Sequence, residues 1–149
     1  MAPTTGFRVA QILLTLSALE FFGPIVRDTG TSHLLNEEWV GHARVHLVWL
    51  LGYMFFSGLA NLYFIWLRRP RSIHSLYLSC LWQGCNLAGF WVSALLVDHY
   101  HGMIVDPRFH HPILGIDENV FAFSVLSAIV VGTAIFLRLV VEPATTRPA

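Results

Sequence analysis

The chain has 149 residues, of which 55% are hydrophobic and only 12% are charged, and its formal net charge is zero. Soluble domains carry about 25% charged residues, and so short a chain has too little interior to hide this much apolar surface from water. The composition therefore excludes an ordinary soluble domain. Without an excess of positive charge, it also offers no basic face for nucleic acid.

Four stretches are long and apolar enough to cross a bilayer, which takes about 20 residues as a helix. The first, 9–26, contains one charged residue, Glu20, and the others (45–67, 72–97 and 119–137) contain no Asp, Glu or Arg. We predict an all-α, polytopic membrane protein, a single domain folded as a four-helix transmembrane bundle. The predicted elements are helices at about 8–26, 40–67, 73–97 and 119–141, then a disordered tail at 142–149.

The arginines predict how the bundle is oriented, because cytoplasmic loops are enriched in positive charge. Six of the nine fall on one side of the predicted spans, namely Arg8, Arg68, Arg69, Arg71, Arg138 and Arg147. The opposite side has three, namely Arg27, Arg44 and Arg108. Both chain ends are then cytoplasmic, and the polar loops 27–41 and 98–118 face the periplasm or a lumen.

Two helix starts and two packing faces are also predicted. Asn36 can cap the second helix, with Glu37 and Glu38 in its first turn, and Asp117 precedes the fourth helix in the same way. Small residues let membrane helices approach closely. We therefore expect two rows of small residues to face neighbouring helices, most simply each other: Cys80, Gly84 and Ala88, and Ser124, Ala128 and Gly132.

Histidines and carboxylates gather on the non-cytoplasmic side. Seven of the eight histidines and seven of the nine carboxylates lie there. Histidine is the usual imidazole ligand of metals, and carboxylates complete its coordination sphere. The alternative is that these side chains are interfacial and solvated.

The most regular pattern is Glu38-x3-His42-x3-His46, since residues four apart share one helix face. A second cluster lies in the long loop. The predicted metal ligands, for a divalent Zn, Fe or Cu ion, are His42, His46, His99, His101, His110 and His111. Two of the pairs, His42-x3-His46 and His110-His111, resemble the histidine boxes of membrane di-iron desaturases and hydroxylases. Those enzymes have longer boxes, usually on the cytoplasmic side, so we do not assign the chain to that family.

Glu20 is unusual because it lies inside a predicted span. A carboxylate there is costly unless it is neutral, paired or facing water. His46 lies at a similar depth, so Glu20–His46 is the predicted acid–imidazole pair, with Arg44 as an alternative partner. The alternative to catalysis is a structural interhelical hydrogen bond.

Further polar and aromatic residues complete the predicted site. The predicted catalytic groups are Glu20, His46, Glu38 and Asp98, and the predicted substrate-binding residues are Trp49, Tyr53, Gln83, Asn86 and Trp91. Gln83, Asn86 and Asn61 could equally be interhelical hydrogen-bonding groups, and the aromatic residues could face lipid.

Three functions remain open. The first is a small membrane enzyme that acts on an isoprenoid, sterol, quinone or fatty chain. It would work by acid–base or metal-assisted isomerisation, cyclisation or hydrolysis near the non-cytoplasmic interface. The second is a protein that binds or transports a transition metal. The third is a non-catalytic subunit of a membrane complex. The expected partners are the bilayer, a lipid-soluble small molecule, and either a second copy or other subunits.

Overall fold

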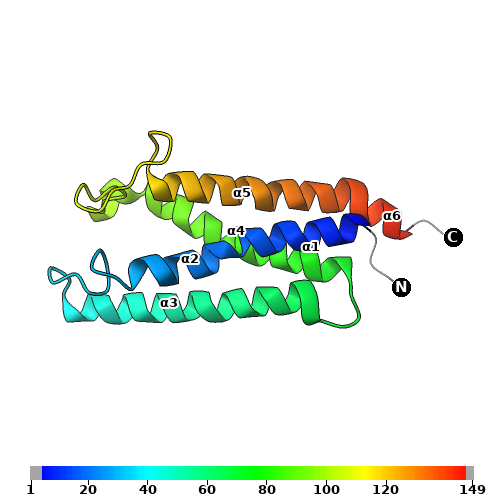
Figure 1. The fold of residues 1–149 in the computed structure, drawn as a ribbon, viewed down its shortest axis with the longest axis horizontal. Helices are drawn as coiled ribbons and strands as arrows, with labels where there is room; N and C mark the ends of the chain where they lie inside the picture. Colours follow the sequence, from blue (N-terminus) through cyan, green and yellow to red (C-terminus); the bar gives the residue numbers. More distant parts are fainter. Residues whose placement is uncertain (1–4, 147–149) are drawn as a thin grey trace.

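The computed structural model describes residues 5–146, and the regular elements in that range are helices, as predicted. Four helical rods run side by side in alternating directions (Figure 1). The rods are α1 (Thr5–Ser17) with α2 (Leu19–Asp28), α3 (Gly41–Leu62), α4 (Ile73–Leu95), and α5 (Glu118–Phe136) with α6 (Glu142–Thr146).

Short turns of other helix types continue these rods. A π-helical turn over Tyr63–Leu67 extends α3, and another over Leu137–Val141 joins α5 to α6. A 3₁₀ turn over Val97–Tyr100 follows α4. The predicted disordered tail therefore begins as helix in α6, and its last three positions lie outside the described residues.

Three of the rods are long and apolar enough to cross a membrane: Thr5–Asp28, Gly41–Leu67 and Glu118–Ala144. The fourth, α4, has 23 residues and no charged side chain. The polar side chains of Gln83 and Asn86 lower its mean hydropathy, so composition alone does not identify α4 as a membrane span.

The ends of the molecule differ in character. The 68–72 turn lies at the same end as the start of α1 and the end of α6 (Figure 1). The connections 29–40 and 101–117 lie at the opposite end, which we call the loop end. The loop end carries most of the histidines and carboxylates.

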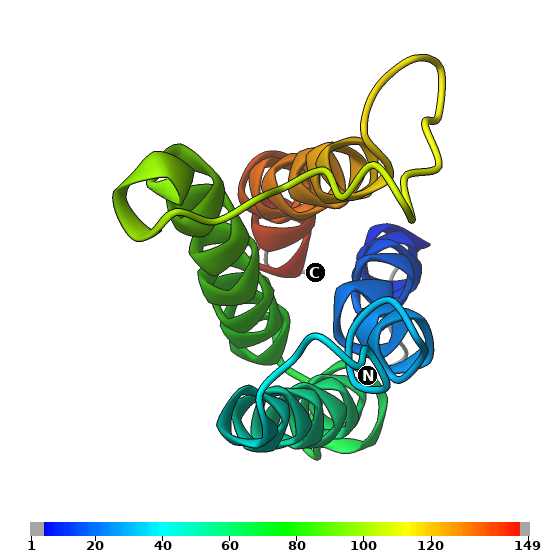
Figure 2. The ribbon, with the colours of Figure 1, turned by 90° about the vertical axis from the view of Figure 1, so that its left-hand side faces the viewer.

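The interior is built from two apolar clusters. α1 packs against α4 and α5, whereas α2 packs against α3. Viewed along the rods, α2, α3, α4 and α5 surround the bundle axis (Figure 2). The larger cluster includes Leu14, Leu76 and Leu137, and the smaller one joins Ala18, Phe21 and Met54 to the partly buried Phe22 and Trp82.

Of the two predicted helix caps, Asp117 is confirmed and Asn36 is not. Asp117 caps α5, because its Oδ1 accepts hydrogen bonds from the backbone N–H groups of Asn119 at 2.9 Å and Val120 at 3.1 Å. The predicted Asn36 cap is wrong, because α3 begins at Gly41 after an extended Val40. Asn36 instead accepts a 3.0 Å bond from the backbone of Glu38 within the loop.

The predicted pairing of small-residue rows is wrong on α5. Ser124, Ala128 and Gly132 are exposed, and α5 meets α4 through a neighbouring face. On that face Phe123 stacks on Phe90 at 3.9 Å between ring centroids, and Ser127 accepts a hydrogen bond from Trp91. Because α5 is apolar on every side, its sequence does not mark which face is buried.

Candidate functional site

Glu20 is buried in the interior of the bundle, with 1% of its surface exposed. It lies in the first turn of α2, after the break in the first rod at Ala18. Neither of its carboxyl oxygens has a hydrogen-bond partner among residues 5–146. Its backbone carbonyl also lacks the usual helical donor, because the residue four positions on is Pro24, which has no N–H.

Two of the unpaired polar groups on α4 share one helix face. The Asn86 side chain lies within reach of a weak hydrogen bond to the Glu20 carboxyl, but its Nδ2 makes no hydrogen bond of regular geometry with any described residue. The indole Nε1 of Trp82, one turn earlier on the same helix face, is equally buried and unpaired there. Leaving a buried donor or acceptor unpaired costs about 1–3 kcal/mol. We call Glu20, Trp82 and Asn86 the buried polar cluster.

An apolar groove of about 590 Å³ runs between α3 and α4. It contains two predicted substrate-binding residues, Trp49 and Tyr53. The full lining is Trp49, Gly52, Tyr53, Phe56, Ser57, Ala60 and Trp82. Trp82 also packs against the smaller apolar cluster, which contains Ala18, Phe21 and Met54, so this residue lies in both the groove and the interior beside α2.

Other predicted substrate-binding residues join helices to one another. Gln83 is fully buried and accepts a hydrogen bond from Ser17 at 2.5 Å. It donates to the Leu14 carbonyl and to the Ser79 hydroxyl, both at 3.1 Å. Trp91 donates to Ser127 of α5 at 3.0 Å. These contacts favour the alternative interpretation of Gln83, as an interhelical hydrogen-bonding group, and they place Trp91 in the contact between α4 and α5.

The predicted Glu20–His46 pair does not form in this structure. His46 is exposed on the outer face of α3, where its Nε2 lies 3.0 Å from the Nε2 of His42. Its ring stacks on Trp49, with 6.2 Å between the centroids. The alternative partner, Arg44, donates to the Asn36 carbonyl at 2.8 Å. The predicted equal depth is also wrong, because Phe21 and Phe22, which follow Glu20, pack against Met54 and Phe55, two helical turns beyond His46.

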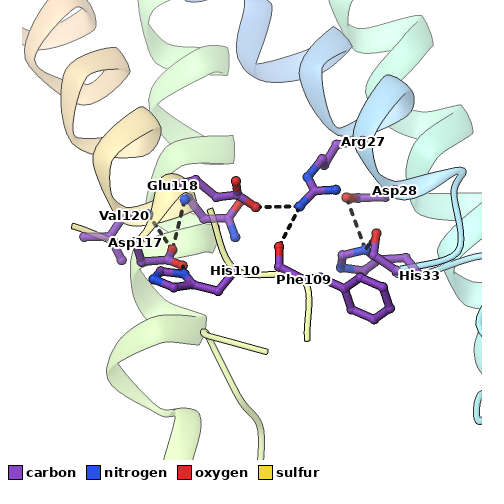
Figure 3. A network of polar contacts seen from close by, with 10 residues as sticks. Arg27, Asp28, His33, Phe109, His110, Asp117, Glu118 and Val120 are labelled. Atoms are coloured by element: carbon purple, nitrogen blue, oxygen red, sulfur yellow. Dashed lines mark hydrogen bonds and ion pairs between the residues drawn. The ribbon is translucent and has the colours of Figure 1, made fainter. Parts of the chain in front are cut away.

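Polar contacts link the end of α2 to the second long connection and to the start of α5 at the loop end (Figure 3). Arg27 at the end of α2 donates to Glu118 at the start of α5 at 2.7 Å, and to the Phe109 carbonyl at 3.1 Å. His110 lies 3.2 Å from the capping residue Asp117. These contacts surround a second cavity, of about 380 Å³.

Arg108 joins the two long connections, 29–40 and 101–117, to each other. It binds Glu38 at 2.9 Å and Asp106 at 2.9 Å. The hydrogen bonds from Arg108 lower the pKa of the Asp106 carboxyl, and both carboxylates raise the pKa of the guanidinium. Glu38 lies in the loop, so the predicted helical row of Glu38, His42 and His46 is reduced to its two histidines.

The six predicted metal ligands do not converge. His99, His101 and His111 are exposed, as is Asp98, and His110 is engaged by Asp117. Within residues 5–146, no three His, Cys, Asp or Glu side chains come close enough to hold a metal ion. The sequence pattern correctly placed His42 beside His46 and could not place the loop histidines, whose positions depend on the path of the loop.

Several residues of these sites were missed from the sequence. Gly52, Phe56 and Ala60 follow Trp49 and Tyr53 at spacings of three or four, which marks one helix face and could have indicated the groove. No spacing pattern marks Arg27 or Arg108 as part of a site, because their partners Glu118 and Glu38 are 91 and 70 residues away in the chain.

Comparison with known proteins adds no assignment. No protein-family model, curated protein or solved structure matches the chain. The function must therefore be argued from the residues themselves.

Proposed function

We propose that this chain is an integral membrane protein that crosses the bilayer four times and binds a lipid-soluble molecule between α3 and α4. The polar end of that molecule hydrogen-bonds to the buried polar cluster. The observation that carries the proposal is the Glu20 carboxyl, which is 1% exposed and has neither oxygen hydrogen-bonded among the described residues. Polar groups of this kind inside membrane spans tend to be functional.

The fourth crossing is made by α4. Its 23 residues extend about 35 Å at 1.5 Å per residue, which exceeds the hydrocarbon thickness of about 30 Å. Gln83 is fully buried and the unpaired Asn86 nitrogen is also shielded, so neither polar group need meet lipid. The position of α4 beside three rods that can each span a membrane supports the same crossing (Figure 1).

The arginines support an orientation with both chain ends in the cytoplasm. The basic turn containing Arg68, Arg69 and Arg71 lies at the end where α1 begins and α6 ends. Positively charged segments are retained on the cytoplasmic side. The loop end then faces the periplasm or a lumen.

The groove indicates the class of ligand. Its walls are mainly aromatic and apolar, and it opens on the side of the bundle where the bilayer lies under this proposal. An isoprenoid, sterol, quinone or fatty chain can enter from the bilayer without passing through water. Its apolar part would lie along Trp49, Tyr53 and Phe56, and its hydroxyl, carbonyl or carboxyl end would reach Trp82.

The chemistry proposed here is acid–base catalysis by Glu20 alone. Glu20 does not itself line the groove, so the polar end of the ligand would have to reach it past Trp82. A carboxyl beside a bound double bond, epoxide or ester can donate and then recover a proton, as isomerisation, cyclisation and hydrolysis require. Asn86 and Trp82 would supply hydrogen bonds that orient the polar end. His46 has no part in this scheme, because it lies on the outer face of α3.

The test is to identify what binds. Protein purified in mild detergent is extracted with organic solvent and analysed by mass spectrometry, as wild type and as Glu20→Gln, Trp82→Phe and Asn86→Leu variants. We expect a lipid-soluble molecule at about one per chain in the wild type. The Glu20→Gln variant should bind it about tenfold more weakly, a loss of about 1.4 kcal/mol, and should therefore retain clearly less of it after purification. Glu37→Gln, at an exposed loop position, is the matched control. Equal occupancy in Glu20→Gln and Glu37→Gln would overturn the proposal.

A further inference from the structure

His42 and His46 are arranged as a two-point metal clamp. Their Nε2 atoms lie 3.0 Å apart, one helical turn from each other, and both rings are exposed. Two imidazole nitrogens bound to one tetrahedral zinc ion lie about 3.3 Å apart, given Zn–N distances of about 2.0–2.1 Å. Binding a metal requires the side-chain torsions to change so that both Nε2 lone pairs point at one ion, because the two nitrogens are now within hydrogen-bond distance of each other.

The chain alone supplies half of a four-coordinate site. Within residues 5–146 no third His, Cys, Asp or Glu joins the pair. The carboxylate expected on the same helix face, Glu38, is instead bound to Arg108. We propose that a second copy of the chain completes the site, so that the His42 and His46 side chains of two α3 helices hold one zinc ion.

The membrane orientation makes this pairing geometrically simple. This step rests on the proposed crossing of α3. Two copies inserted in the same orientation can be related by a two-fold axis along the membrane normal. A residue near such an axis meets its own counterpart at the same depth. The two histidine pairs then arrive at one level, near the start of α3, where zinc can reach them from water.

The surroundings of the clamp suit a helix partner. Val45, at 63% exposure, extends the same outward surface of α3 and would be covered by the partner helix. Two α3 helices that cross at the level of the zinc site move apart with distance from it. The groove beyond Tyr53 therefore stays open to a lipid-soluble molecule, and the zinc site does not compete with the proposed function.

The test uses zinc and oligomeric state together. Full-length protein in detergent is stripped with a chelator, titrated with zinc chloride, and measured by native mass spectrometry and metal analysis. We expect one zinc per two chains and a zinc-dependent dimer. His42→Ala and His46→Ala should each abolish both, while His101→Ala, at an exposed loop histidine, should change neither.

Two outcomes would overturn the zinc proposal. One is a zinc ion bound to monomers, and the other is zinc-dependent dimerisation that survives both His42→Ala and His46→Ala. Circular dichroism of the His42→Ala and His46→Ala variants checks that each remains folded. The Glu20→Gln variant separates the two proposals, because it should lose the lipid-soluble molecule and keep the zinc dimer. A wild type that carries the lipid-soluble molecule but forms no zinc dimer refutes the zinc site alone.

Discussion

The hydroxyl of Ser79 in α4 donates a 2.7 Å hydrogen bond to the side-chain oxygen of Asn61 in α3. Ser79 also accepts from Gln83, which accepts in turn from Ser17 of α1. One chain of donors and acceptors thus connects three helices through fully buried side chains. Interhelical hydrogen bonds of this kind replace the hydrophobic driving force that is absent between helices in lipid.

Ser79→Ala should therefore destabilise the bundle. It leaves the Asn61 oxygen and one Gln83 donor without a partner, which costs about 1–2 kcal/mol. The matched control is Ser93→Ala on the same helix, because Ser93 is exposed and its hydroxyl donates to the Phe90 carbonyl of its own helix. Unfolding in mixed detergent and denaturant measures both free energies. Equal losses for the two variants would mean that the network adds nothing to stability.

Gly58 should tolerate no side chain where α3 meets α2. A Cβ built there comes within 2.5 Å of the Phe22 ring, so Gly58→Ala must push that ring away. We expect a loss of about 1–3 kcal/mol. Gly132→Ala is the control, because nothing lies within 4 Å of its added Cβ. The thermal midpoints of the two variants compare the sites, and a neutral Gly58→Ala would show that α2 and α3 pack less closely than described.

Much of the fold followed from the sequence, and the site did so in part. Long uncharged stretches predict helices wherever they occur, and Glu20 was noticeable because a charge inside such a stretch is costly. The direction in which a side chain points around a membrane helix is harder to predict. On α5 every face is apolar, and on α3 the exposed His46 lies among residues as hydrophobic as the buried ones, so periodicity does not separate inside from outside.

Arg108 should control the ionisation of Asp106. The hydrogen bonds from Arg108 depress the pKa of Asp106. They therefore stabilise the fold fully at a pH above the ordinary pKa of Asp, and this stabilisation is lost as the pH falls through the depressed pKa. In Arg108→Gln the pKa of Asp106 should return toward its ordinary value. Carbon-13 NMR titration of the aspartate carboxyl groups measures the change. An unchanged Asp106 pKa would contradict the loop contact.

The proposed topology predicts which side of the membrane each connection faces. In a background with Cys80→Ala and Cys85→Ala, single cysteines are introduced as Thr31→Cys in the loop end and Ser72→Cys in the basic turn. A membrane-impermeant maleimide added to intact cells should label the first variant, and should label the second only after lysis. Labelling of both positions in intact cells would contradict a membrane crossing by α3.

The central claim is that a lipid-soluble molecule binds between α3 and α4 with its polar end at Glu20, Trp82 and Asn86. The most direct measurement is photolabelling of the protein in lipid nanodiscs with diazirine analogues of a fatty acid, a sterol and an isoprenoid, followed by peptide mapping. We predict that one analogue labels the Trp49–Phe56 and Trp82–Asn86 segments, saturates, and is displaced by its unlabelled parent. Labelling spread over the exposed apolar surface of α5, without saturation or displacement for any analogue, would contradict a specific site between α3 and α4.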